Sequence, residues 1–130
     1  MPYIHIQVSG EADSALARRI AEQATELTAR VLGKDRKLTA VAIDFIAPAH
    51  WFVAGTPLQA GQPRSYHWMV SITDETNTKN EKAAYLEAVH SSMRELLGAV
   101  ADHSYAHIAD LRGSAYGYGG RTQEYRYQHA

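Results

Sequence analysis

Residues 2–8 read PYIHIQV and begin a pattern that recurs later in the chain. Isoleucine and valine alternate there with tyrosine, histidine and glutamine, which is the period of a strand with one buried face. Asp13 then offers an N-cap to a helix whose apolar residues recur at helical spacing as far as Gly33. Residues 39–46 are apolar or β-branched almost throughout and predict a central strand, covered on one or both faces. Together these segments predict a βαβ unit.

The same plan starts again after residues 54–65, which hold two glycines and two prolines and predict a loop. Residues 66–73 predict a strand. Thr78 begins a capping-box pattern, so a second amphipathic helix should start there. Residues 104–111 predict the last strand, which completes a second βαβ unit.

The two halves also correspond in sequence. HWFVAGT at residues 50–56 aligns with SAYGYGG at residues 114–120 at an offset of 64, and the same offset relates Pro2 to Tyr66. The helices align best with a couple of residues inserted before the second one. We therefore expect one domain over residues 1–130. Its repeats would span 2–56 and 66–120, followed by a tail at 121–130.

Composition narrows the classes of function. Thirteen lysines and arginines face fourteen aspartates and glutamates, which argues against a broad nucleic-acid or anionic-membrane surface. The absence of cysteine excludes disulfides and thiolate metal sites and fits a reducing cytoplasm. The first residues lack the pattern of a secretory signal, and no apolar run approaches the roughly 18 residues of a membrane span. These features predict a soluble, cytoplasmic protein.

Pro2 after the initiator methionine, the PYIHIQV strand, the long helix and the aromatic-glycine stretch at residues 50–55 resemble the tautomerase superfamily, typified by 4-oxalocrotonate tautomerase. The length and the repeat are similar to fused members, in which two βαβ units share a chain. The resemblance extends from Pro2 to about Gly120. It implies an α+β (α/β) fold with a four-stranded mixed sheet backed by two helices, assembled as a homotrimer. It also implies that Pro2 lies in an active site near a subunit boundary.

Pro2 is the candidate catalytic residue. Removal of Met1 would expose a secondary amine with a reference pKa of about 8, which burial or a neighbouring cation would lower towards physiological pH. In the family, such a proline acts as base and acid in keto-enol proton transfer on a small carbonyl compound. The alternative is that proline only begins an edge strand, where its missing N–H does no harm. If Met1 stays in place, the Pro2 nitrogen is an amide and this mechanism is impossible.

The sequence departs from the family pattern where relatives that act on dicarboxylates are expected to carry arginines. Glu11, Ala12 and Val41 occupy the corresponding positions. A neutral carbonyl substrate, or an anion held by other groups, is therefore expected. Residues 73–76 also lack the arginine pair of related dehalogenases, which argues against dehalogenation.

Six residues are candidates for contacting the substrate. The aromatic pair would wall a dry pocket, the strand histidine and tyrosine would face a substrate oxygen, and an arginine would hold an oxyanion or carboxylate. The set is Trp51, Phe52, Tyr105, His107, Arg112 and Arg121. Each also has an ordinary structural interpretation, as an interface aromatic, a strand residue or a solvated arginine.

No cofactor or metal is expected. His103 and His107 are four residues apart but fall across a strand start, without clustered carboxylates. The alternative to an isomerase is a non-catalytic trimeric module that binds a ligand or a protein on the same scaffold.

Overall fold

A computed structural model describes residues 1–59 and 63–130. Its centre is a four-stranded sheet in the order β2-β1-β5-β6. The strands are β1 (Tyr3–Ser9), β2 (Ala40–Ile46), β5 (Tyr66–Thr73) and β6 (Tyr105–Leu111). β1 and β2 are parallel, as are β5 and β6, whereas β1 and β5 are antiparallel. The expected mixed sheet is thus confirmed.

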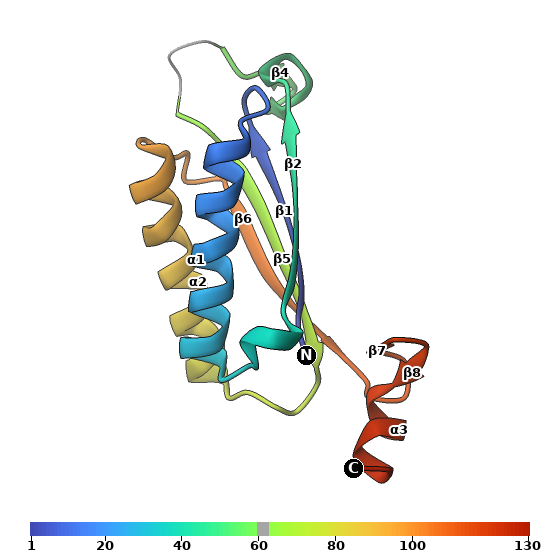
Figure 1. Ribbon diagram of the computed structural model, residues 1–130. Coiled ribbons are helices and arrows are strands. Elements are labelled where there is room, and N and C mark those ends of the chain that lie inside the picture. Colours follow the sequence, from blue (N-terminus) through green and yellow to red (C-terminus); the bar gives the residue numbers. More distant parts are fainter. Residues whose placement is uncertain (60–62) are drawn as a thin grey trace.

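The helices α1 (Ser14–Leu32) and α2 (Lys79–Leu97) lie side by side on one face of this sheet (Figure 1). The predicted caps are present. Asp13 accepts a hydrogen bond from the Leu16 amide at 3.0 Å, and Thr78 forms the reciprocal capping box with Glu81. Gly33 ends α1 in the left-handed conformation, with a φ of 69°.

The core lies between the helices and the two central strands. Every second residue of β1, from Ile4 to Val8, is fully buried. Trp68 on β5 donates its indole N–H to the Tyr85 hydroxyl of α2 at 3.1 Å. That hydroxyl also bonds Thr28 of α1 at 2.8 Å. A satisfied polar contact therefore links both helices to the sheet inside an apolar core.

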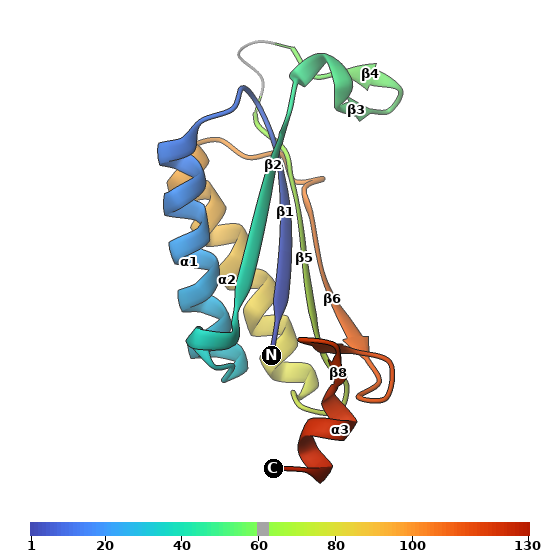
Figure 2. The same cartoon turned by 45° about the vertical axis from the view of Figure 1, so that its right-hand side comes forward.

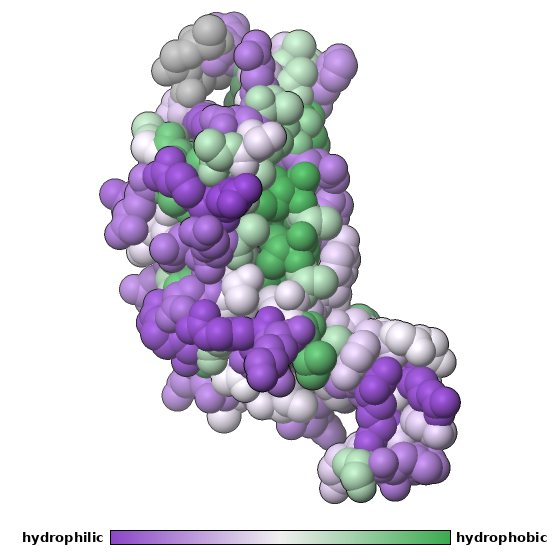
Figure 3. All heavy atoms as spheres, viewed as in Figure 1, coloured by the Kyte–Doolittle hydropathy of each residue, from purple (hydrophilic) through white to green (hydrophobic). Residues whose placement is uncertain are grey.

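The prediction that residues 39–46 form a central strand was wrong, because β2 is an edge strand of the sheet. Val41, Ile43 and Phe45 pack against the core and remain partly exposed. Figure 3 shows a hydrophobic area beside α1, where β2 runs. An apolar run indicates burial without telling whether the cover comes from the same chain or from another.

Two hairpins extend the repeat. β3 (Phe52–Val53) pairs with β4 (Thr56–Pro57), and β7 (Gly117–Tyr118) pairs with β8 (Arg121–Thr122). The short helices η1 (Arg36–Leu38) and η2 (Pro48–His50) precede β2 and β3, and α3 (Gln123–Gln128) ends the chain. The helical α3 was not expected in the tail.

The repeat is a local two-fold arrangement centred where His5 pairs with Met69. The offset is 64 for these central strands and 65 for the helices and both hairpins. One residue is thus inserted before the second helix, and the alignment of the hairpins at 64 was wrong by one. Glycine-rich hairpins align almost equally well when shifted. The reliable landmark is the pair of positive-φ residues in each turn, which are 54 and 55 in one hairpin and 119 and 120 in the other.

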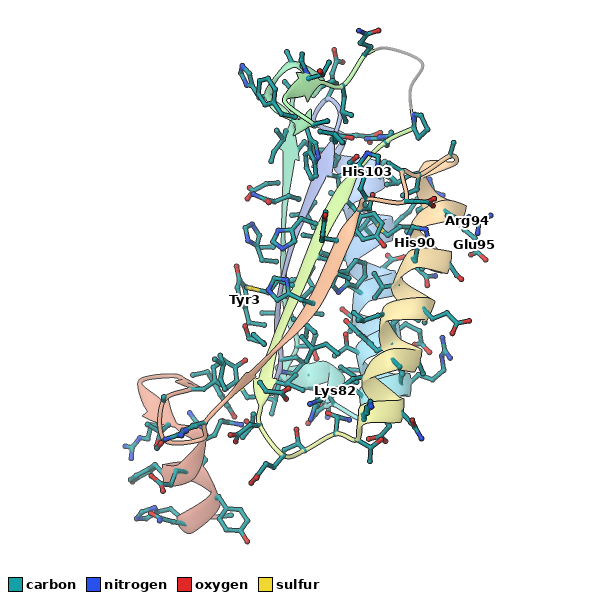
Figure 4. The ribbon with its side chains drawn as sticks, turned by 180° about the vertical axis from the view of Figure 1, so that it is seen from behind. Tyr3, Lys82, His90, Arg94, Glu95 and His103 are labelled. Atoms are coloured by element: carbon teal, nitrogen blue, oxygen red, sulfur yellow. The ribbon has the colours of Figure 1, made fainter. Side chains whose placement is uncertain are left out.

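The two-fold arrangement places the hairpins at opposite ends of the sheet. Figures 1 and 2 show the N-terminus beside β7, β8 and α3 at one end, with the β3-β4 hairpin at the other. Figure 4 shows Tyr3 projecting from the sheet face that lies away from the helices. Among the described residues, no helix combines the length and apolar character needed to cross a bilayer.

Candidate active site

Pro2 is buried at the start of β1. Its carbonyl oxygen accepts a hydrogen bond from the Ala40 amide of β2 at 3.2 Å. With Met1 in place, the Pro2 nitrogen is an amide. The proline thus lies at the end of a central strand, held in the sheet through the one hydrogen-bonding group that its backbone retains.

The Tyr116 hydroxyl lies beside this terminus. It is 2.7 Å from the Met1 carbonyl oxygen and 3.0 Å from the Ser71 carbonyl oxygen of β5. Burial raises the pKa of Tyr116, against the effect of a backbone hydrogen bond from Tyr3. The phenol is therefore a protonated hydrogen-bond donor at neutral pH. The sequence indicated no role for Tyr116 beyond its place in the repeat.

Lys34 is the nearby cation. It follows the C-cap of α1 and donates to the Thr76 hydroxyl at 2.8 Å. Burial lowers the pKa of the Met1 α-amino group below its usual 8.0, and the charge of Lys34 lowers it further, against an opposing effect of Asp35. The pKa of Lys34 itself is lowered by burial and raised by Glu81 and Asp110. No role for Lys34 was predicted from the sequence. Its place directly after the C-cap glycine of α1 is the one local signal that could have drawn attention to it.

A cleft of about 750 Å³ opens at this end. Its lining includes Met1, Lys34, residues 73–76 from the turn after β5, and Gln123 and Tyr127 from the C-terminal segment. Two polar atoms of lining residues, Thr73 Oγ1 and Gln123 Oε1, are buried without a hydrogen-bond partner among the described residues. The cleft therefore combines a cation, the chain terminus and unused polar atoms.

The predicted substrate-contacting residues divide between the two ends of the sheet. Trp51, Phe52, Tyr105 and His107 line a second pocket, of about 490 Å³, at the end away from Pro2. The Phe52 side chain is 59% exposed and that of Tyr105 is 69% exposed. Within one chain, the structure does not bring these four residues to Pro2.

Neither predicted arginine lines the Pro2 cleft in one chain. Arg112 is exposed in the turn after β6. Arg121 places its guanidinium carbon 4.4 Å from the centroid of the Tyr125 ring, so its charge is directed to the C-terminal helix. Lys34 is the cation that the fold brings next to the terminus.

The other end carries a histidine pair. His67 and His107 stack with ring centroids 5.2 Å apart, and their Nε2 and Nδ1 atoms are 3.4 Å apart. Burial, followed by the charges of His107 and His5, lowers the pKa of His67. Within the described residues, no group of three or more histidine, cysteine, aspartate or glutamate side chains is arranged to hold a metal ion.

Tyr66 occupies the position that corresponds to Pro2 in the second repeat. Its hydroxyl bonds His90 Nδ1 at 2.8 Å, and burial raises its pKa to about 12. A chain interior cannot supply a terminal amine, so only the Pro2 end has one available.

Residues 2–61 match a family model described as Tautomerase enzyme. The first βαβ unit of the chain therefore matches the tautomerase family. Solved structures with the same fold cover nearly all of the chain. Native fused 4-OT has a TM-score of 0.83 at 18% identity and covers 95% of this chain and 97% of its own. No curated protein matches the chain in sequence.

Two further structures have the same fold. Pt0534 inactivated by 2-oxo-3-pentynoate has a TM-score of 0.83 at 14% identity, covering 95% of this chain and 98% of its own. A wild-type fused 4-OT described as a symmetric trimer has a TM-score of 0.81 at 15% identity, covering 94% and 96%. The family match over residues 2–61 supports a tautomerase-type function. At such identities, the likeness itself concerns the fold.

Proposed function

We propose that this protein is a tautomerase that transfers a proton between the keto and enol forms of a small 2-oxo acid. Pro2, exposed by removal of Met1, acts as the general base and then as the general acid. The observation that carries the proposal is the position of Pro2, which is buried beside a cleft where burial and Lys34 both lower the pKa of an amine. Both effects favour the neutral form, which is the form that accepts a proton.

Lys34 takes the place of the missing arginines in this proposal. It attracts one substrate carboxylate towards the terminus. Asp74, Glu75 and Glu124 also line the cleft and would repel a second carboxylate. A monocarboxylate therefore fits the charges better than a dicarboxylate.

We propose further that the whole chain acts as one domain in a homotrimer, with repeats at 2–56 and 66–120. The hairpin of one copy would approach the Pro2 cleft of a neighbour, so that Trp51, Phe52, Tyr105 and His107 act across the boundary. Three features support this arrangement. They are the exposure of Phe52 and Tyr105, the apolar edge strand β2, and the trimers among the structural relatives.

The test begins with the intact mass of the untagged protein, followed by the rate of ketonisation of phenylenolpyruvate across pH. The expected results are a mass without Met1 and a rate that rises with an apparent pKa below about 8. Treatment with 2-oxo-3-pentynoate should add mass at Pro2. Retained Met1, or a processed protein that is inert over the whole range, would contradict the proposal.

A second candidate is a non-catalytic trimeric binding module on the same scaffold. The observation that favours it is that Glu11 and Val41 occupy positions where relatives that act on dicarboxylates are expected to carry arginines. A Pro2→Ala variant separates the two functions. It should lose turnover if the protein is an enzyme, and keep all ligand or partner binding if it is a module.

A further inference from the structure

We propose that Tyr116 is a catalytic residue whose hydroxyl donates a hydrogen bond to the reacting carbonyl oxygen of the substrate. The proposal rests on the proposed function, because it needs Met1 to be removed and Pro2 to act as the base. It adds the group that stabilises the oxygen on which negative charge develops.

The Met1 carbonyl group shows where a substrate carbonyl can bind. Its oxygen stands in for the substrate oxygen and lies 2.7 Å from the Tyr116 hydroxyl. In a trans peptide, the carbonyl oxygen is about 2.2 Å from the next nitrogen, so the hydroxyl lies within about 5 Å of the Pro2 nitrogen. A 2-oxo acid whose C3 contacts that nitrogen carries its carbonyl oxygen two bonds further on. The base and the donor can therefore reach the two reacting atoms together.

The Tyr116 hydroxyl has one proton to donate, and two neighbouring carbonyl oxygens can accept it in a hydrogen bond. They belong to Met1, at 2.7 Å, and to Ser71, at 3.0 Å. Once Met1 is gone, Ser71 keeps the hydroxyl oriented between turnovers. During enolisation, Pro2 takes the proton from C3 and the electron pair of that C–H bond moves towards the carbonyl oxygen. An enolate oxygen is a stronger hydrogen-bond acceptor than an amide carbonyl oxygen, so the hydrogen bond from Tyr116 strengthens as the reaction proceeds. Tyr116 keeps its proton throughout, and Pro2 returns the proton taken from C3 to the enolate oxygen, which gives the enol.

The backbone around Tyr116 is held in place. Its carbonyl accepts from the Gln123 amide at 2.7 Å, and the preceding Ala115 amide donates to Arg112 at 2.8 Å. At the offset of 65 that relates the hairpins, the equivalent residue at the other end is Trp51, which has no hydroxyl. The donor therefore accompanies Pro2 alone.

Tyr116→Phe is the first test, measured on the processed protein with phenylenolpyruvate. Turnover should fall about a hundredfold, as when one oxyanion donor is removed. The pKa of the rising limb, which reports Pro2, should change little. Tyr118→Phe is the matched control. It keeps the ring, whose centroid lies 3.8 Å from the Arg126 guanidinium carbon, and removes only the hydroxyl, so the rate should be nearly unchanged.

A second variant guards against a general structural effect. A fluorinated tyrosine at position 116 keeps the shape of the ring and acidifies the hydroxyl, so the loss of activity at alkaline pH should move to lower pH. The role of Tyr116 is overturned if Tyr116→Phe keeps full turnover and the fluorinated protein loses activity at the same alkaline pH as the unmodified one. If Pro2→Ala is inert in the same experiment, the proposed function still stands. Full turnover by Pro2→Ala would overturn both.

Discussion

The two ends of the sheet are built on the same plan and differ in chemistry. The Pro2 end has a chain terminus, a nearby lysine and a tyrosine hydroxyl that bonds the Met1 carbonyl. The opposite end has Tyr66 in place of proline, tied to His90, and a pair of stacked histidines. Duplication of a βαβ unit therefore repeats its backbone but not its terminal amine, because a chain has one N-terminus.

The largest effect is expected from Pro2→Ala. The variant keeps a terminal amine after Met1 removal but loses the secondary amine and its fixed direction, so turnover should fall by about a thousandfold. The rate of ketonisation, with size-exclusion chromatography to verify assembly, measures this. Tyr66→Ala at the other end is the comparison. Equal losses of turnover per folded protein would erase the proposed difference between the ends.

Lys34→Gln should have the next largest effect. Without the lysine charge, the protonated amine is less disfavoured, so the pKa of Pro2 should rise and the rising limb of the rate profile should move to higher pH. KM for a 2-oxo acid should also increase about tenfold, because a charged hydrogen bond to the carboxylate is lost. Lys37→Gln is the control, since Lys37 is exposed in η1. If Lys34→Gln leaves the rate profile as unchanged as the Lys37→Gln control does, the proposed role of Lys34 is refuted.

Tyr66→Phe should affect stability and leave turnover unchanged. The substitution removes a part-buried hydrogen bond to His90, which contributes on the order of 1 kcal/mol to the free energy of unfolding. Urea denaturation measures this loss, and the ketonisation assay checks activity. A large fall in turnover at full stability would mean that the Tyr66 hydroxyl itself takes part in catalysis.

The smallest effect concerns His67, whose pKa is lowered in the folded state. The unfolded chain then binds a proton more readily, so stability present above pH 6.5 is lost as pH falls through the lower folded pKa. Thermal unfolding from pH 7.5 to 5 should show this decline, and His67→Gln should flatten it. An identical pH dependence in the variant would assign the decline to other groups.

Periodicity and capping were enough to predict the four strands and two long helices, because alternation in β1 and the Thr78 capping box are local signals. The order of the strands depends on pairing between segments far apart in the sequence, so the edge position of β2 was missed. The hairpin motif associated Trp51 and Phe52 with Pro2, whereas the fold of one chain separates them along the sheet. Tyr116 and Lys34 were missed as site residues because only tertiary structure brings them to the terminus.

Catalysis by Pro2 can be tested by titrating the N-terminal amine. The titration is followed by NMR in protein labelled with ¹⁵N-proline and compared with the pH-rate profile. We expect a free Pro2 amine that titrates below the α-amino reference of about 8, at the same pH as the rising limb of the rate. A retained Met1, or an amine that titrates at or above 8 without any relation to the rate, would contradict this expectation.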